Sequence, residues 1–97
     1  MTVSPVSRTR HHRETSAFRR EVLAFGKAVR NYRRGRAWTI EEAAEHFGVE
    51  PAYVRSIESG RTNPSLAVIV SIAEAFEVRA GEMLLPAGTA RGARGRR

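Results

Sequence analysis

The sequence predicts an all-α fold, a compact domain of five helices between residues 16 and 85. Apolar residues recur there at three- and four-residue steps, and no segment alternates apolar and polar residues as a half-buried strand does. Residues suited to helix caps precede three of these segments, and glycine or proline ends four of them. The flanking segments lack this periodicity, so we expect a disordered basic arm over residues 1–15 and a disordered Arg/Gly-rich tail over residues 86–97.

The first predicted helix starts near Thr15 or Ser16 and ends near Gly35. Its apolar residues form one stripe that would face the core: Phe18, Val22, Phe25, Val29 and Tyr32. Trp38 follows in the connection to the next helix, and we expect it to pack in the core or close it rather than stack on a base.

The stretch Ile40–Gly60 predicts two short helices joined by a tight turn. Thr39 and Glu42 have the three-residue spacing of a capping box at the start of the first helix. Gly48 stands where the chain turns, with a positive φ that only glycine adopts at little cost. Pro51 suits the first position of the second helix, because a proline there loses no hydrogen bond.

Two further helices complete the predicted domain. Ser65 caps a helix over Leu66–Phe76 that is apolar nearly all round. Such a helix is buried in the centre of the domain or shares a face with a partner chain. A short fifth helix near Arg79–Leu85 is ended by Pro86.

Length and composition exclude several classes of protein. Ninety-seven residues suit one small domain, and the absence of cysteine excludes disulfides, thiolate metal sites and a cysteine nucleophile. No apolar run approaches the ~20 residues that span a bilayer, and the N-terminus lacks the apolar core of a signal peptide. We therefore expect a cytoplasmic protein with no membrane contact.

The net charge of +7 is unevenly distributed. Residues 19–36 carry seven basic side chains and one acidic one, whereas residues 37–85 carry three basic and eight acidic ones. Both flanking segments are also basic. A basic helix and basic tails beside an acidic remainder fit a polyanion approached from one side, although solvated surface charge explains the same numbers.

We expect no catalytic residues, no cofactor and no metal site. The chain has no aspartate, no phosphate-binding glycine loop and no spaced set of histidine and glutamate ligands. His46 is the only histidine inside the predicted domain and falls on an exposed helix face, and His11 and His12 lack the spaced partners of a metal site.

The stretch Ile40–Gly60 resembles the helix-turn-helix of the Cro/phage-repressor-like (XRE) family of transcriptional regulators. The small, turn and core positions of that motif are occupied here by Ala44, Gly48, Val49, Val54 and Ile57. Outside the motif, similarity to the family's first helix and to its link into the fourth helix rests on Phe25-Gly26, Arg30, Arg33, Ile57–Gly60 and Asn63–Leu66. The resemblance covers roughly Ala17 to Leu85, most of the chain.

The resemblance implies a lambda-repressor-like DNA-binding domain that regulates transcription, for instance as a repressor. Such a protein binds a palindromic operator in double-stranded DNA as a homodimer, with the second helix of the motif in the major groove. The implied base-reading positions are Pro51, Ala52, Arg55 and Ser56, of which Arg55 has the fork to read guanine O6 and N7. The implied phosphate contacts are Arg33, Thr39, Ser59, Arg61 and Asn63.

Two further roles complete this set of expectations. By resemblance, Arg33 pairs with Glu58 at the end of the recognition helix and ties that helix to the scaffold. Apolar residues near the end of the domain predict a dimer interface, because exposed groups of this kind mark partner surfaces: Val78, Met83, Leu84 and Leu85.

Three departures from the family pattern leave an alternative open. Ile40 replaces a glutamine that often touches phosphate, Glu50 replaces a Ser or Thr cap, and Pro51 replaces a polar base-reader. The alternative is an antitoxin or anti-regulator of the same fold whose main partner is a protein, such as a toxin or another regulator.

Overall fold

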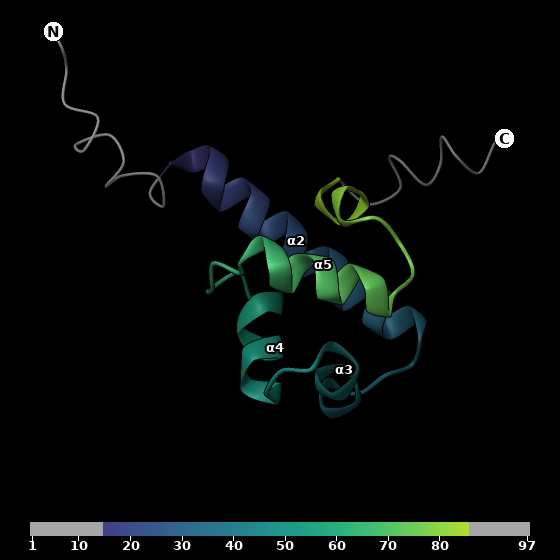
Figure 1. The fold of residues 1–97 in the computed structure, drawn as a ribbon. Coiled ribbons are helices and arrows are strands. Elements are labelled where there is room, and N and C mark those ends of the chain that lie inside the picture. The colour runs from purple at the N-terminus through teal and green to yellow at the C-terminus, as the bar shows by residue number, and fades with distance from the viewer. Residues whose placement is uncertain (1–14, 86–97) are drawn as a thin grey trace, which may run out of the picture.

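The computed structural model describes residues 15–85, so the predicted tail and all but the last residue of the predicted arm lie outside the described residues. Within residues 15–85 the chain is all-helical, which confirms the predicted fold class. Figure 1 shows α5 crossing in front of α2, with α3 and α4 below them. The elements are α2 (Ser16–Gly35), α3 (Ile40–Phe47), α4 (Pro51–Glu58), α5 (Leu66–Ala75) and the 3-10 helix η2 (Ala80–Leu84).

Three of the four α-helices within residues 15–85 begin with a side-chain cap. In each, the hydroxyl before the helix accepts a hydrogen bond from the amide three residues later: Thr15 from Phe18 (3.0 Å), Thr39 from Glu42 (3.0 Å) and Ser65 from Val68 (3.1 Å). Glu42 completes the predicted capping box by accepting from the Thr39 amide at 2.8 Å. In contrast, α4 begins without such a bond, because Glu50 at its cap position makes none.

All four α-helices end in a similar way, with a residue of left-handed backbone conformation after the last turn. After α2, the amide of Ala37 bonds to the carbonyl of Arg34 and the amide of Trp38 bonds to that of Arg33, the two-bond closure of a Schellman motif. The left-handed residues are Ala37, Gly48, Gly60 and Glu77, with φ of 58°, 75°, 74° and 62°. Glycine therefore occupies this position after α3 and α4 but not after α2 and α5.

The predicted fifth helix is wrong in type, because η2 is a 3-10 helix of five residues. Its bonds span three residues: the Glu82 amide donates to Arg79 O at 3.0 Å and the Leu85 amide donates to Glu82 O at 3.3 Å. A segment this short gains too few four-residue bonds to form an α-helix cooperatively.

The apolar core draws on all five elements. Its buried members are Phe25, Val29, Ala43, Ala44, Phe47, Val54, Ile57, Ile72, Ala73, Phe76 and Met83. The apolar helix α5 contributes one side to this core and leaves another at the surface, where Leu66 is 71% exposed and Val70 is 40% exposed. The sequence allowed either a helix buried in the centre of the domain or a helix that shares a face with a partner chain. Because these side chains are exposed in a single chain, α5 is not buried in the centre.

Trp38 closes the core, as the sequence predicts. Its ring stacks on Phe76 with centroids 5.4 Å apart and on His46 with centroids 3.8 Å apart. Arg36 covers the same ring, since its guanidinium lies 5.5 Å from the Trp38 centroid and donates to the carbonyl oxygen of Phe76 at 3.0 Å. The Trp38 ring is thus packed against other side chains of the domain.

Gly26 allows α2 to approach the end of α4 closely. A Cβ atom at this position would lie 2.4 Å from the carbonyl oxygen of Ile57 and 3.0 Å from that of Glu58. Both are backbone atoms, which cannot move aside as the end of a side chain can. The absence of a side chain at Gly26 therefore sets the distance between the two helices.

Candidate nucleic-acid interface

The turn between α3 and α4 fixes the orientation of α4. Gly48 has φ of 75°, and the amide of Val49 returns to the carbonyl of Ala44 at 3.0 Å. Val54 and Ile57 face the core from α4, with exposed fractions of 0% and 2%. The opposite side of α4 therefore lies at the surface, at the edge of the molecule (Figure 1).

The four predicted base-reading positions fall on this outer side of α4 to different degrees. Ala52 and Arg55 are exposed, whereas Pro51 and Ser56 are half-buried. The Ser56 carbonyl accepts from Ser59 Oγ at 3.1 Å, so it is engaged within the end of the helix. Arg55 is the one basic residue of α4.

Arg33 and Glu58 form the structural pair that the resemblance implies. Arg33 Nε donates to Glu58 Oε2 at 2.6 Å and Nη2 donates to Oε1 at 3.0 Å, a two-pronged contact. Arg33 Nη1 also donates to the carbonyl oxygen of Trp38 at 3.0 Å. The hydrogen bond to Glu58 raises the pKa of Arg33 above its ordinary value, so the guanidinium stays charged. All three guanidinium nitrogens are engaged inside the protein.

Arg30 lies beside this pair and was assigned no contact from the sequence. Its Nε is 3.5 Å from Glu58 Oε1, and its side chain is 47% exposed, compared with 13% for Arg33. Since Arg33 is largely buried and fully engaged, Arg30 is the better-placed cation for a phosphate at this end of α4. The sequence did contain a signal for the position of Arg30, because Arg30 precedes Arg33 by three residues on the same helix face.

Arg55 forms an ion pair across the helix-turn-helix. Its Nη2 donates to Glu41 Oε2 at 3.0 Å, linking the middle of α4 to the first turn of α3. Both side chains remain largely in water, with exposed fractions of 55% for Arg55 and 65% for Glu41. The sequence offered no spacing rule for this contact, because it joins two helices through a turn.

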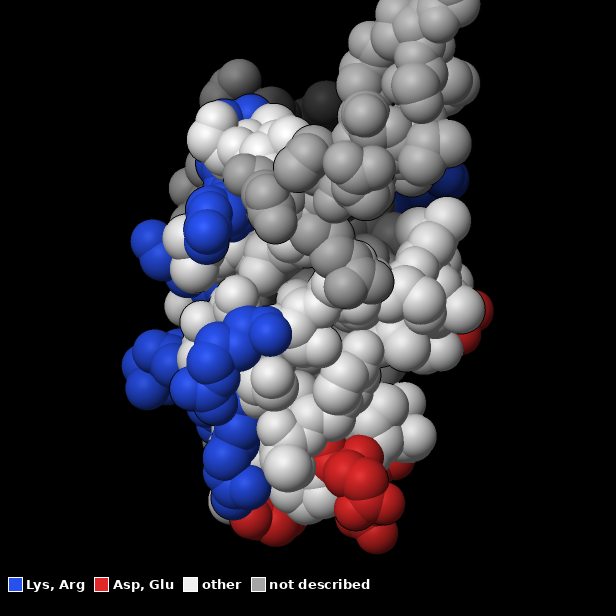
Figure 2. All heavy atoms as spheres, turned by 90° about the vertical axis from the view of Figure 1, so that its left-hand side faces the viewer, with Lys and Arg blue, Asp and Glu red and all other residues white. Residues whose placement is uncertain are grey.

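The remaining phosphate candidates lie around α4 at the surface. Thr39, Ser59, Arg61 and Asn63 are all exposed. The Thr39 hydroxyl accepts a bond as the cap of α3 and keeps its own hydrogen to donate. Figure 2 views this side of the molecule and shows Lys and Arg gathered in a column, with acidic side chains mainly at its lower end.

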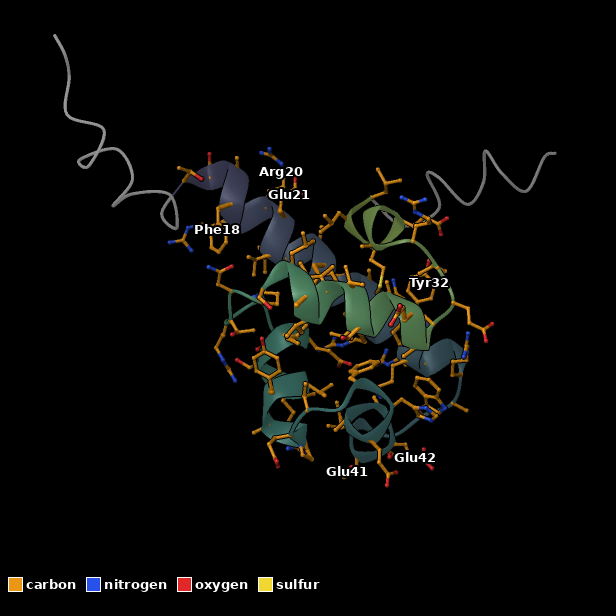
Figure 3. The ribbon with its side chains drawn as sticks, in the orientation of Figure 1. Phe18, Arg20, Glu21, Tyr32, Glu41 and Glu42 are labelled. Carbon is orange, nitrogen blue, oxygen red and sulfur yellow. The ribbon has the colours of Figure 1, made fainter. Side chains whose placement is uncertain are left out.

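An open hollow adjoins the loop that follows α4. It has a volume of about 430 Å³ and lies between the first turns of α2 and the loop. Figure 3 shows Phe18 at this end of α2, beside the loop. The lining residues are Phe18, Val22, Gly60, Arg61, Thr62 and Asn63.

The predicted dimer residues do not share one environment. Met83 is wrong as an interface residue, because it is fully buried in the core of a single chain. Val78 and Leu84 are half-buried, and Leu85 is 41% exposed. Within residues 15–85, the most exposed of the large apolar side chains is Leu66 on α5, a residue that the sequence did not single out for the interface.

Other classes of site find no support in the part of the chain that the structure describes. No group of three or more His, Cys, Asp or Glu residues within residues 15–85 could hold a metal ion. Across the same residues, every helix is too short or too polar to cross a bilayer.

Comparisons with known proteins agree with this geometry. The family model HTH_3, described as helix-turn-helix, matches residues 29–83, more than half of the chain. A hypothetical transcription factor of Neisseria meningitidis is 37% identical over 67 residues, which are 69% of this chain and 61% of the relative. The chain thus spans less than two thirds of that relative's length.

Solved structures show the same fold. The crystal structure of the Neisseria hypothetical transcription factor NHTF has a TM-score of 0.67 and 29% identity, covering 78% of this chain and 83% of that one. The restriction-modification controller protein C.AhdI of Aeromonas hydrophila has a TM-score of 0.61 and 29% identity, covering 64% and 94%. The clp gene regulator ClgR of C. glutamicum has a TM-score of 0.61 and 32% identity, covering 68% and 82%. These relatives are described as a hypothetical transcription factor, a restriction-modification controller protein and a gene regulator.

Proposed function

Since the chain belongs to the helix-turn-helix family of the Cro/phage-repressor-like (XRE) type, we propose that it regulates transcription by binding a palindromic operator. In this proposal it binds double-stranded DNA as a homodimer, with α4 of each protomer in the major groove. The relatives named above are transcription factors and gene regulators, which supports the same class of function here. A regulator of this kind acts on the chromosome, so a cytoplasmic location is part of the proposal.

The observation that carries the proposal is the exposure of Arg55 on the outer side of α4, whose opposite side is packed against the core. The helix is anchored at its end by the Arg33–Glu58 pair, so its outer side keeps one orientation. An arginine in the major groove can bond guanine O6 and N7 together, the commonest sequence-specific contact. Pro51 and Ala52 would offer apolar contact to a thymine methyl group, and Ser56 a hydroxyl.

Contacts to phosphate would position the domain on the duplex without reading sequence. Thr39 supplies a hydroxyl group, Asn63 an amide and Arg61 a charge from the exposed surface. The Ser59 hydroxyl would have to turn from the Ser56 carbonyl, to which it donates its hydrogen, to meet a phosphate. Arg33 would act through its pair with Glu58, and Arg30 would supply the charge at the surface. The column of basic side chains in Figure 2 supports a polyanion on this side of the molecule.

A homodimer would cover exposed apolar side chains of α5 and of the end of the domain. Leu66, Val70 and Leu85 are large apolar residues at least 40% exposed in the single chain. Half-buried Val78 and Leu84 adjoin the same C-terminal part of the domain. A two-fold dimer places its two reading helices about one DNA turn apart, roughly 34 Å.

The proposal is tested by selecting bound sequences from a pool of random duplexes and by measuring the oligomeric state. We expect enrichment of an inverted repeat whose half-sites lie about one turn apart, and a dimer in ultracentrifugation at micromolar concentration. Absence of any enrichment, with no duplex binding at low salt, would refute DNA recognition and favour the alternative of a protein partner.

A further inference from the structure

We propose that Glu41 is a positioning residue for Arg55 and thereby sets how strongly the protein discriminates between DNA sequences. The inference rests on the proposed function, because it assumes that Arg55 meets base edges. Glu41 lies on α3, the other helix of the motif, so a search for residues that contact bases would not find it. The observation behind it is the ion pair that joins α3 to α4 on the outer surface.

The geometry leaves part of the guanidinium available while holding the rest. Only Nη2 of Arg55 takes part in the pair, at 3.0 Å from Glu41 Oε2. The Nε and Nη1 hydrogens and the second hydrogen of Nη2 remain for another acceptor. A guanidinium held at one corner in this way can still present two donors to a guanine.

The carboxylate is held in place by its own helix. Glu41 lies in the first turn of α3, next to the capping box of Thr39 and Glu42, where a negative charge is favoured by the helix dipole. Figure 3 shows Glu41 and Glu42 on the side of α3 turned away from α5. Glu42 is engaged with the amide of Thr39, so the two neighbouring carboxylates have different partners.

The consequence of the pair concerns where Arg55 can go when DNA is near. An unpaired arginine on this surface could bond a phosphate as readily as a base, and phosphate contacts carry no sequence information. With Glu41 attached, the pair has no net charge and the carboxylate repels phosphate. The remaining donors therefore gain most from a neutral acceptor such as guanine O6 or N7.

Exposure makes the pair weak in the free protein and stronger in the complex. Exposed ion pairs contribute little in water, so this pair is not needed for the fold. In the groove, water is displaced and the same hydrogen bond strengthens. Glu41 thus acts on Arg55 at the point where the base is read.

The test compares Glu41→Gln with Glu45→Gln, which removes the same charge from another exposed position of α3. Affinities for the selected duplex and for a scrambled duplex are measured at two salt concentrations, with thermal melting as a check on folding. For Glu41→Gln we expect the ratio of the two affinities to fall about fivefold, the upper end of what one exposed ion pair contributes. The loss should come mainly from tighter binding to the scrambled duplex, with a salt slope steeper by about 0.9.

The control and a double-mutant cycle decide between mechanisms. Glu45→Gln should change both affinities by a similar factor and leave the ratio intact. On an Arg55→Ala background, Glu41→Gln should no longer alter the ratio, because its effect passes through Arg55. An unchanged or increased ratio for Glu41→Gln, or an equal fall for Glu45→Gln, would overturn the role of Glu41 alone. A wild-type protein without sequence preference, or one that keeps its preference in Arg55→Ala, would overturn the base-reading proposal and this inference with it.

Discussion

Two residues of α4, Arg55 and Glu58, form the same kind of ion pair in opposite surroundings. At the C-terminal end, Glu58 is 4% exposed and accepts two bonds from Arg33, close to where Gly26 brings α2 against the helix. One turn earlier, on the outer side of the helix, Arg55 meets Glu41 through a single bond, and both side chains are more than half exposed. At the N-terminal end of α4, Glu50 adds no side-chain cap.

The difference shows that burial decides what an arginine–glutamate pair does. Removing one partner of a buried pair leaves a charge without compensation, which is strongly destabilising. An exposed pair contributes about 0–1 kcal/mol and can exchange partners easily. The inner side of α4 is therefore fixed to the scaffold at Glu58, while Arg55 on its outer side remains able to exchange partners.

The largest expected effect comes from breaking the buried pair. Arg33→Ala should lower the free energy of unfolding by about 3 kcal/mol, because Glu58 would keep only Arg30 as a partner. Arginine is charged throughout the working range and its pKa here is raised, so its contribution is fully present below its ordinary pKa. Urea denaturation should therefore give the same loss at about pH 6 and about pH 9.

Arg33→Lys serves as the control for charge alone. Lysine keeps the positive charge but cannot form the two-pronged contact with Glu58, so part of the loss should remain. A loss below about 1 kcal/mol for Arg33→Ala would show that the Arg33–Glu58 pair behaves like an exposed one, which would remove the contrast between the two ion pairs.

A second change tests the close contact behind the same end. Gly26→Ala should destabilise the domain by about 2 kcal/mol, because its Cβ would overlap the backbone carbonyl of Ile57. Gly35→Ala provides a matched control, since a Cβ there meets no atom within 4 Å and Gly35 is also in α2. Denaturant titration of both variants separates overlap from the general effect of glycine on a helix.

The third prediction concerns the exposed Arg55–Glu41 pair and separates binding from stability. Arg55→Ala should change the free energy of unfolding by less than about 0.5 kcal/mol, as expected for an exposed pair. It should nevertheless cost about 1–3 kcal/mol per half-site in discrimination at one base pair. Arg61→Ala should instead weaken cognate and scrambled duplexes equally, and equal losses for Arg55→Ala would remove Arg55 from base reading.

The smallest expected effect comes from supplying the missing cap. Glu50→Ser should add a hydrogen bond at the start of α4, offset in part by the loss of a favourable charge at a helix N-terminus. We expect a net gain of about 0.5 kcal/mol in the free energy of unfolding, measured by thermal and urea unfolding. A net loss would mean that Glu50 stabilises α4 chiefly through its charge.

Local signals in the sequence predicted most of the fold. The helices follow from apolar spacing, and their starts from Thr39, Ser65 and Pro51, because caps act over three or four residues. The fifth element was placed correctly but given the wrong type, since five residues do not distinguish an α-helix from a 3-10 helix by pattern. Met83 was assigned to the surface because an apolar residue near a domain end has the same sequence signature whether buried or exposed.

The candidate site was predictable where a family pattern exists and not elsewhere. The Arg33–Glu58 pair spans 25 residues and was named only through resemblance, since no spacing rule links the two. The Arg55–Glu41 pair depends on the angle between α3 and α4, which the sequence does not state. The exposure of Leu66 and Val70 could not be predicted, because α5 is apolar nearly all round and the pattern does not say which side faces the core.

The left-handed backbone conformation of Ala37 and Glu77 has a consequence for how the domain can evolve. A side chain in this backbone conformation costs about 1 kcal/mol, and the two residues follow the C-terminal ends of α2 and α5, which lie at the right of Figure 1, whereas α4 lies at the left. Glycine at either position would raise the stability of the domain without changing α4. Such a gain would offset destabilising substitutions in α4, so that, under the proposed function, the base preference of α4 could change while the fold is kept.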